Sequence, residues 1–295
     1  MGIEVHLVDG TYELFRQFFA PGRPSRVNAN GLEVGAARAV VRNLFGMLEE
    51  GVTHLGVATD HVIESFRNDL YGPYKDGSGI EPEIKNQFEP LELAIEACGI
   101  ALFPMVEFEA DDGMASAAAV AAADPEVDRV LLCTADKDLA QSVRAGRVLQ
   151  LDNRRNKLFD VADVVEKFGV PPESIPDWLA LTGDSADGFP GLKGWGAKSS
   201  AAVLAHYRTI ENIPLHHGQW EVTVRGASKL AGTLRENLAD ALLFKKLATL
   251  DVSAPTISNV EELRWTGPTD AINDAAEMLM APDIVRRAEH LAAHR

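Results

Sequence analysis

The chain has 295 residues, of which 46% are hydrophobic and 24% charged, a composition typical of globular proteins and unlike that of disordered or fibrous chains. Its 28 basic and 44 acidic residues give a net charge of −16, which argues against a protein that coats nucleic acid with its whole surface. No apolar run approaches the roughly 20 residues of a membrane span, and the first residues lack a secretory pattern. Two cysteines are too few for a disulfide framework. We therefore expect no membrane partner and a cytoplasmic location.

Short apolar runs, each followed by a helical pattern, predict buried parallel strands. The predicted strands lie at residues 3–8, 54–59, 130–134 and 148–151. The predicted helices of this half lie at residues 32–50, 88–98, 111–123 and 161–168. The alternation indicates a doubly wound α/β domain with right-handed crossovers. In such domains ligands bind beyond the carboxyl ends of the strands.

The second half of the chain differs in pattern and in charge. From about Ser174, after the pair Pro171-Pro172, helices replace the strand pattern. Residues 191–250 hold eight basic and four acidic residues, a net charge of +4 in a chain whose net charge is −16. We predict an α/β domain at residues 1–173 and a helical domain at residues 174–295. The basic segment indicates a surface for a polyanion, with chance on a solvated surface as the alternative.

Acidic residues gather where the predicted strands end and helices begin. The nine candidates are Asp9, Asp60, Glu109, Asp111, Asp112, Asp136, Asp138, Asp184 and Asp187. Each alone is typical of a helix cap or turn, but together at one sheet edge they would repel unless cations neutralise them. Oxygen ligands without His or Cys suit Mg²⁺ or Mn²⁺ rather than Zn²⁺. Two such ions about 4 Å apart are the usual device for phosphodiester cleavage.

Four motifs carry a resemblance to a known family. They are LVDG at Asp9, FEADD at 108–112, TADKDLAQ at 134–141 and LTGDSADGFPGLKGWGAKSSAAVL at 181–204. In this order, over about residues 1–250, the chain resembles the structure-specific 5′ nucleases, which include flap endonucleases and the 5′→3′ exonuclease domain of bacterial DNA polymerase I. Because no polymerase sequence follows, it is similar to the free-standing bacterial members. The resemblance implies a parallel-sheet, PIN-like nuclease domain, a helical gateway at about 61–108 and a helix-hairpin-helix-like duplex-binding domain.

The resemblance also implies roles for the nine acids and two active-site ions, Mg²⁺ or Mn²⁺. The inner metal ligands would be Asp9, Asp60, Glu109 and Asp111. The residues completing the first site, or holding water around it, would be Asp112, Asp136 and Asp138. The outer half of the second site would be Asp184 and Asp187. Because all nine positions retain a carboxylate, we expect an active enzyme.

Two segments would hold DNA. The residues of the 191–198 loop that would grip duplex phosphates, by resemblance through a K⁺ ion on loop carbonyls, are Gly191, Lys193, Gly194, Gly196 and Lys198. Glycines and a helix start allow such an approach to phosphate. In the gateway, Lys75 would stabilise charge on the scissile phosphate and Arg67 would hold a phosphate. Tyr74 either stacks on a base or packs, and Arg16 either contacts DNA or pairs with a clustered acid.

The gateway departs from the family pattern, because residues 61–108 hold three basic and nine acidic residues. Gly188 and Ala135 replace a common Asn and a common Gly in their motifs. Our leading hypothesis is a monomeric 5′ nuclease acting on DNA with a 5′ flap, nick or 5′ end, and on RNA–DNA hybrids. One alternative is a DNA-junction binding protein of the same fold that does not cut. Another is a ribonuclease of a related acid-cluster fold, a class that lacks the GxGxK hairpin present here.

Overall fold

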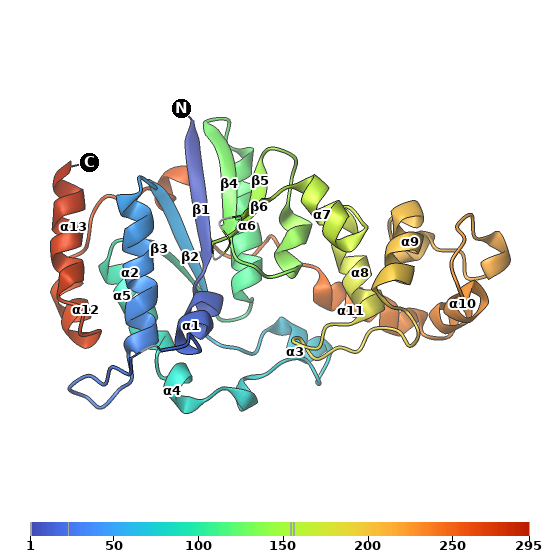
Figure 1. Ribbon diagram of the computed structural model, residues 1–295, viewed down its shortest axis with the longest axis horizontal. Coiled ribbons are helices and arrows are strands. Elements are labelled where there is room, and N and C mark those ends of the chain that lie inside the picture. Colours follow the sequence, from blue (N-terminus) through green and yellow to red (C-terminus); the bar gives the residue numbers. More distant parts are fainter. Residues whose placement is uncertain (1, 23, 154, 156, 295) are drawn as a thin grey trace. The chain divides into compact units, whose positions relative to one another are not determined.

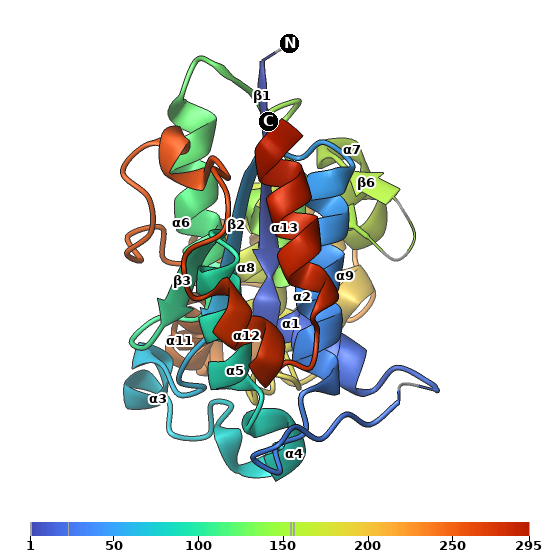
Figure 2. The ribbon, with the colours of Figure 1, turned by 90° about the vertical axis from the view of Figure 1, so that its left-hand side faces the viewer.

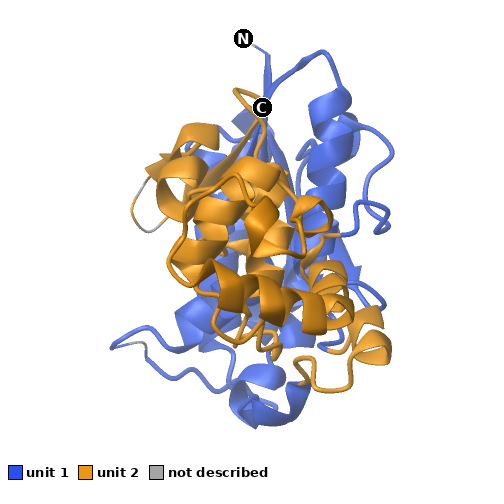
Figure 3. Cartoon of the chain, turned by 90° about the vertical axis from the view of Figure 1, so that its right-hand side faces the viewer, with its two compact units in different colours: residues 1–63, 77–134, 251–295 blue, residues 64–76, 135–250 orange. Residues whose placement is uncertain are grey.

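The computed structural model describes every residue except 1, 23, 154, 156 and 295. The chain forms two compact units, shown in different colours in Figure 3. Unit 1 comprises residues 1–63, 77–134 and 251–295, and unit 2 comprises residues 64–76 and 135–250. These units differ from the predicted ranges, because residues 135–173 belong to unit 2 and residues 251–295 belong to unit 1.

Unit 1 is built on parallel strands in the order β3-β2-β1-β4 (Figure 1). Their bounds are β1 Ile3–Asp9, β2 His54–Asp60, β3 Ala101–Met105 and β4 Val127–Cys133. Three of these strands were predicted within a few residues. The apolar pattern does not predict β3, because Pro104 interrupts it. A proline is tolerated there because β3 ends the strand order and Pro104 is exposed.

Helices cover the strands of unit 1 on two sides, with α6 on one side and α2 on the other (Figure 2). The helices are α1 Gly10–Phe18, α2 Gly35–Glu49, α4 Pro82–Lys85, α5 Phe88–Ala97, α6 Ala110–Ala123, α12 Ile272–Met278 and α13 Asp283–His294. The small residues of α6 let it approach the sheet closely, since a Cβ at Gly113 would lie 2.8 Å from the Met105 side chain. The C-terminal segment joins unit 1 through Arg42–Asp283 and Arg287–Glu49 ion pairs.

Unit 2 is mainly helical and includes one β hairpin. Its helices are α3 Phe66–Leu70, α7 Val161–Phe168, α8 Ile175–Thr182, α9 Ala197–Tyr207, α10 Ala227–Glu236 and α11 Leu238–Ala248. The predicted strand at 148–151 is β5 (Val148–Asp152), but it pairs antiparallel with β6 (Lys157–Phe159), which the periodicity does not predict.

The core of unit 2 lies between α8, α9 and α11. Phe189 stacks on Phe244 of α11 with 5.6 Å between ring centroids. Trp195 is 5% exposed, and its Nε1 donates to the Leu230 carbonyl at 3.2 Å, so this tryptophan packs in the core. Within the described part of the chain, no helix combines the length and the apolar character that crossing a membrane requires.

Candidate metal centre

The acids of unit 1 stand at the carboxyl ends of its strands. Asp9 ends β1, and its Oδ1 accepts the Tyr12 backbone N–H at 2.8 Å, so the side chain also caps α1. The Thr134 hydroxyl donates to the other carboxylate oxygen at 3.3 Å. The side chain is therefore fixed at the strand end by groups on either side of it.

Asp60 ends β2 and lies beside the start of α6. Its Oδ1 accepts the Ala110 N–H at 2.9 Å, while the Thr11 hydroxyl accepts the Asp60 backbone N–H at 2.8 Å. Glu109 caps α6 and is 4% exposed, and Asp111 stands in the first turn of the same helix. The strand end and the helix start thus bring three of the predicted inner ligands into one neighbourhood.

Asp112 differs from these neighbours because both of its oxygens bind backbone groups. It is fully buried, with Oδ2 accepting the Glu109 N–H at 3.0 Å and Oδ1 accepting the Asp251 N–H at 2.8 Å. It fastens the C-terminal segment to the start of α6. This structural role was not predicted from the sequence.

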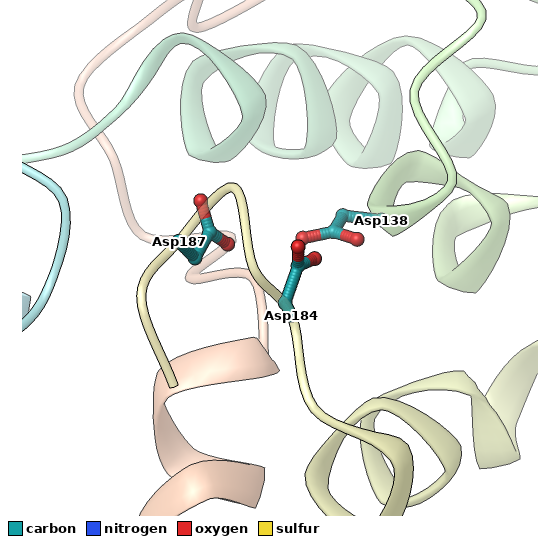
Figure 4. Close-up of side chains that lie close together, drawn as sticks. All are labelled: Asp138, Asp184 and Asp187. Carbon is teal, nitrogen blue, oxygen red and sulfur yellow. The ribbon is translucent and has the colours of Figure 1, made fainter. Parts of the chain in front are cut away.

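In unit 2, three carboxylates converge (Figure 4). Asp138 begins a 3-10 helix at Asp138–Ser142, and Asp184 and Asp187 lie on the loop after α8. One oxygen from each of these three buried residues lies within 4.8 Å of the others. Distant parts of the sequence thus supply one set of hard oxygen ligands.

Two lysines neutralise part of this charge. The Lys137 ammonium binds Asp184 and lies 3.6 Å from Asp138 Oδ1. The Lys75 ammonium lies 3.2 Å from Asp187 Oδ1, and the Lys75 backbone N–H donates to the Asp187 carbonyl at 3.0 Å. Burial opposes the charged form of Lys137, but the surrounding aspartates outweigh it and raise the pKa of this ammonium. Lys137 lies inside the DKDL motif, and its position between two acids is the signal that sequence reasoning overlooked.

The hydrogen-bonding capacity of the Asp138 carboxylate is not fully used, despite the two nearby lysines. It is 7% exposed, and its buried Oδ1 has no hydrogen-bond partner among the described residues. Burial, followed by the charges of Asp136, Asp187 and Asp184, raises its pKa well above the ordinary value, although Lys137 opposes the shift. A buried carboxylate oxygen that accepts no hydrogen bond from the described residues, and that lies among mutually repelling carboxylates, fits a divalent cation.

Neighbouring side chains fix the geometry of this group. Asp136 Oδ1 accepts the Asp138 N–H at 2.9 Å, and Gln150 donates to the Asp136 carbonyl. Gln141 donates to the carbonyls of Asp138 and Ala248, each at 2.9 Å. Both glutamines are positioning residues that the sequence alone did not single out.

Gly188 shapes the loop that carries Asp184 and Asp187. Its φ is +84°, and a Cβ there would lie 2.4 Å from the Pro73 carbonyl oxygen. The loop closes where Asp184 and Phe189 exchange backbone hydrogen bonds of 2.8 and 3.0 Å. The glycine that departs from the family pattern therefore allows this loop to approach the segment carrying Lys75.

Three residues predicted to contact DNA make contacts within the protein. Arg67 is 1% exposed and donates to the Leu247 and Thr249 carbonyls at 2.7 and 3.0 Å, so in this structure its guanidinium holds backbone carbonyls. Tyr74 is 3% exposed within the core of unit 2, which favours packing. Arg16 pairs with Glu13, a residue outside the nine acids, with 3.0 Å between Nε and Oε1.

The predicted duplex-binding loop contains two kinds of residue. Gly191 has φ +66°, and a Cβ there would lie 2.3 Å from the Gly183 nitrogen, so this glycine serves a close backbone crossing. The other four predicted residues of the loop are exposed: Lys193, Gly194, Gly196 and Lys198. Gly194, Gly196 and Lys198 line a cavity of about 480 Å³ at the start of α9, together with Arg225, which the sequence analysis did not select.

Comparisons with known proteins match both halves of the chain. The family described as the 5′-3′ exonuclease, N-terminal resolvase-like domain, matches residues 4–169. The family described as the 5′-3′ exonuclease, C-terminal SAM fold, matches residues 170–271. Together these matches support a sheet-based nuclease domain and a helical region, the fold class expected from the sequence.

Individual relatives agree with these matches. A 5′-3′ exonuclease of Aquifex aeolicus is 32% identical over 211 residues, which are 71% of each chain. DNA polymerase I of Pseudomonas aeruginosa is 32% identical over 268 residues, which are 87% of this chain and 28% of the polymerase. The chain thus spans less than a third of its DNA polymerase relatives. A bacteriophage T5 flap endonuclease, solved as a complex with DNA and metal ions, has the same fold with a TM-score of 0.65, 19% identity, and coverage of 97% of this chain and 99% of the other.

Proposed function

Because this chain belongs to the 5′-3′ exonuclease family of metal-dependent nucleases, we propose that it hydrolyses phosphodiester bonds in DNA that carries a 5′ flap, a nick or a 5′ end. The observation that supports this most directly is the converging group of Asp138, Asp184 and Asp187, in which a buried oxygen lacks a hydrogen-bond partner among the described residues. The ammonium groups of Lys137 and Lys75 offset only part of the negative charge of this group, so a divalent cation bound there would be favourable.

Two groups of carboxylates are the proposed ligands for two divalent ions. Unit 1 offers Asp9, Asp60, Glu109 and Asp111, and unit 2 offers Asp136, Asp138, Asp184 and Asp187. Asp112 fixes the backbone at Glu109, a member of the first group, because its oxygens accept the N–H groups of Glu109 and Asp251. When bound, such ions activate water and stabilise charge on the phosphate. An all-oxygen ligand set supports Mg²⁺ or Mn²⁺.

The chain's own cations would bind and orient the substrate. The Lys75 side chain is about one-third exposed, so its ammonium can exchange Asp187 for a phosphate oxygen. Lys137 can neutralise part of the negative charge of the aspartates while no metal is bound. We expected Arg67 to hold a phosphate as well, but in this structure its guanidinium donates to backbone carbonyls.

The exposed part of the 191–198 loop is the proposed duplex contact. Gly194 and Gly196 leave the backbone accessible, and Lys198 and Arg225 add positive charge to the same cavity. Contacts of this kind position DNA through its phosphates without reading sequence. A K⁺ ion on the loop carbonyls remains part of the proposal by resemblance. RNA–DNA hybrids are further proposed substrates, because both kinds of strand present the same phosphate groups to such contacts.

We also propose that the protein acts as a monomer in the cytoplasm. Its cysteines, Cys98 and Cys133, are free and buried. Burial raises the pKa of the Cys98 thiol to about 12, so this thiol is unreactive near neutral pH. Such cysteines are consistent with a reducing compartment.

The test is cleavage of a 5′-flap duplex and a nicked duplex, labelled at each end, with Mg²⁺ or Mn²⁺. We expect cleavage that EDTA abolishes and that D136N lowers by at least about a hundredfold. The matched control D240N changes an exposed aspartate on α11 and should leave the rate unchanged. Product lengths separate release of single nucleotides from internal cuts.

Equal cleavage by D136N, or cleavage that survives EDTA, would overturn the proposed mechanism. Binding of the flap at low salt without product, across several metals, would instead favour the non-cutting junction protein. The excess of acidic residues at 61–108 is the feature that makes this second outcome worth measuring.

A further inference from the structure

A cavity in unit 1 has a positively charged lining, in contrast to the negatively charged carboxylate groups of the proposed metal site. We call it the arginine pocket, because Arg26, Arg38 and Arg42 line its volume of about 360 Å³. Arg26 comes from the loop before α2, and Arg38 and Arg42 stand one turn apart on α2. None of the nine acids is among its described lining residues.

The positive charge of the arginine pocket is only partly compensated. Arg42 donates from Nε to Asp283 Oδ2 at 2.9 Å, and Arg38 Nη2 lies 4.0 Å from the same carboxylate. The nearby carboxylate of Glu33 accepts the Arg26 backbone N–H at 3.0 Å. Burial, together with the charges of Arg42 and Arg26, lowers the pKa of Arg38, and Asp283 opposes this shift. Two guanidiniums therefore share one carboxylate, and a further anion would relieve their repulsion.

The remaining walls indicate which anion fits. Pro21 and Pro24 contribute apolar surface, and Gln17 and Asn43 contribute amide groups that can donate or accept hydrogen bonds. Guanidinium groups match phosphate oxygens in pairs and bind them by charge-assisted hydrogen bonds. The volume falls within the range of about 300–1,000 Å³ that is typical of small-molecule sites. An apolar wall beside arginines suits a ligand with a flat apolar part and a phosphate.

We propose that the arginine pocket binds the phosphate group of a nucleotide. The group has two sources, a free mononucleotide or a phosphate within a single strand, and both present the same oxygens to the arginines. The inference does not depend on cleavage, because a chain that binds here and cuts nothing would satisfy it.

The test measures binding of three probes in the presence of EDTA. The probes are inorganic phosphate, deoxyadenosine 5′-monophosphate and a short single-stranded oligonucleotide, each titrated calorimetrically. We expect R26Q and R38Q each to weaken binding about tenfold, and D283N to strengthen it by freeing two guanidiniums. The control R264Q changes an exposed arginine of unit 1 that pairs with Glu261, and it should have no effect.

The pattern of losses identifies the source. Loss of mononucleotide and phosphate binding supports a free nucleotide. Loss confined to the oligonucleotide, with a shallower dependence of affinity on salt, supports a strand phosphate. Wild-type affinity of R26Q and R38Q for all probes, or equal loss in R264Q, would overturn the proposal. If R38Q unfolds, R26Q decides, because Arg26 is exposed on a loop.

Discussion

The carboxylates of the two units are held in different ways. In unit 1 they are fixed mainly by the backbone, since Asp60 binds the Ala110 N–H and Asp112 binds two further N–H groups. In unit 2 backbone N–H groups also bind Asp136 and Asp184, but part of the negative charge is compensated by the ammonium groups of Lys137 and Lys75. Backbone donors at a helix start cannot move without unfolding the turn, whereas an ammonium on a flexible stem can be displaced by an incoming cation. The acidic group of unit 1 is thus preorganised, and that of unit 2 is adjustable.

The largest effect should come from removing a backbone-bound carboxylate of unit 1. Asp112→Ala leaves the N–H groups of Glu109 and Asp251 without their acceptor in a fully buried place. We expect the free energy of unfolding to fall by about 3 kcal/mol, because each unsatisfied buried donor costs about 1–3 kcal/mol. Urea unfolding measures the loss. The control Asp274→Ala, at an exposed position of α12, should change stability by less than about 0.5 kcal/mol.

The next effect concerns the adjustable group of unit 2. A divalent ion at about 100 times its dissociation constant should stabilise the wild type by about 2.7 kcal/mol, by linkage. Asp138→Asn should be slightly more stable than the wild type in EDTA, because the substitution relieves repulsion from Asp136, Asp184 and Asp187. The same variant should lose most of the stabilisation by metal. Thermal unfolding with and without Mg²⁺ measures both effects, and equal metal stabilisation of the two proteins would remove Asp138 from the site.

The sequence predicted the elements with strong periodicity and the acids at their ends. Asp9 and Asp60 follow apolar runs, so their place at strand ends could be inferred from the carboxyl-edge rule. The helix predicted at 161–168 agrees with the bounds of α7, because its apolar spacing is regular and Asp160 caps it. By contrast, β3 contains a proline, and β6 is only three residues long and carries no alternation.

The sequence could not predict which polar side chains are buried and which are exposed. Arg67 and Tyr74 occupy positions where a family resemblance implies contact with DNA, yet both are buried. Arg67 is held by α11, 180 residues later in the chain, whose Leu247 carbonyl accepts its Nε–H at 2.7 Å, and Tyr74 packs in the core of unit 2. The role of Lys137 likewise depends on Asp184, which lies 47 residues away. Such pairings are long-range and leave no periodic signal.

A smaller effect should follow from a substitution at Gly188. Gly188→Asn restores a residue common in the family motif, but its Cβ would lie 2.4 Å from the Pro73 carbonyl. Asn tolerates a positive φ, so the cost comes from the shift of the neighbouring backbone, about 2 kcal/mol. The shift should also separate Lys75 from Asp187 and lower the affinity for a phosphate substrate. Unfolding and binding measurements test both effects. The control Gly218→Asn, with open space around its Cβ position, should be neutral.

The smallest effect is a dependence of unit 1 on pH. His6 and His54 lie buried on β1 and β2, and burial lowers the pKa of both below the ordinary value, with a smaller contribution from Arg129 and Arg264 respectively. The unfolded chain therefore binds protons at a higher pH than the folded chain does. The histidines' contribution to stability is fully present above about pH 6.5, the ordinary pKa of histidine, and is lost as the pH falls below it toward the lowered pKa of the folded state.

Hydrogen exchange at pH 7 and pH 5 tests this difference between the units. Amides of unit 1 should lose protection at pH 5, whereas amides around the exposed His206, His216 and His217 of unit 2 should change little. The double variant H6Q/H54Q should flatten the pH dependence of unit 1, and H217Q should leave it intact. An equal loss of protection in both units, in the wild type and in H6Q/H54Q alike, would contradict this prediction. Protonation of carboxylates, which both units contain, would then be the cause instead of protonation of the buried histidines.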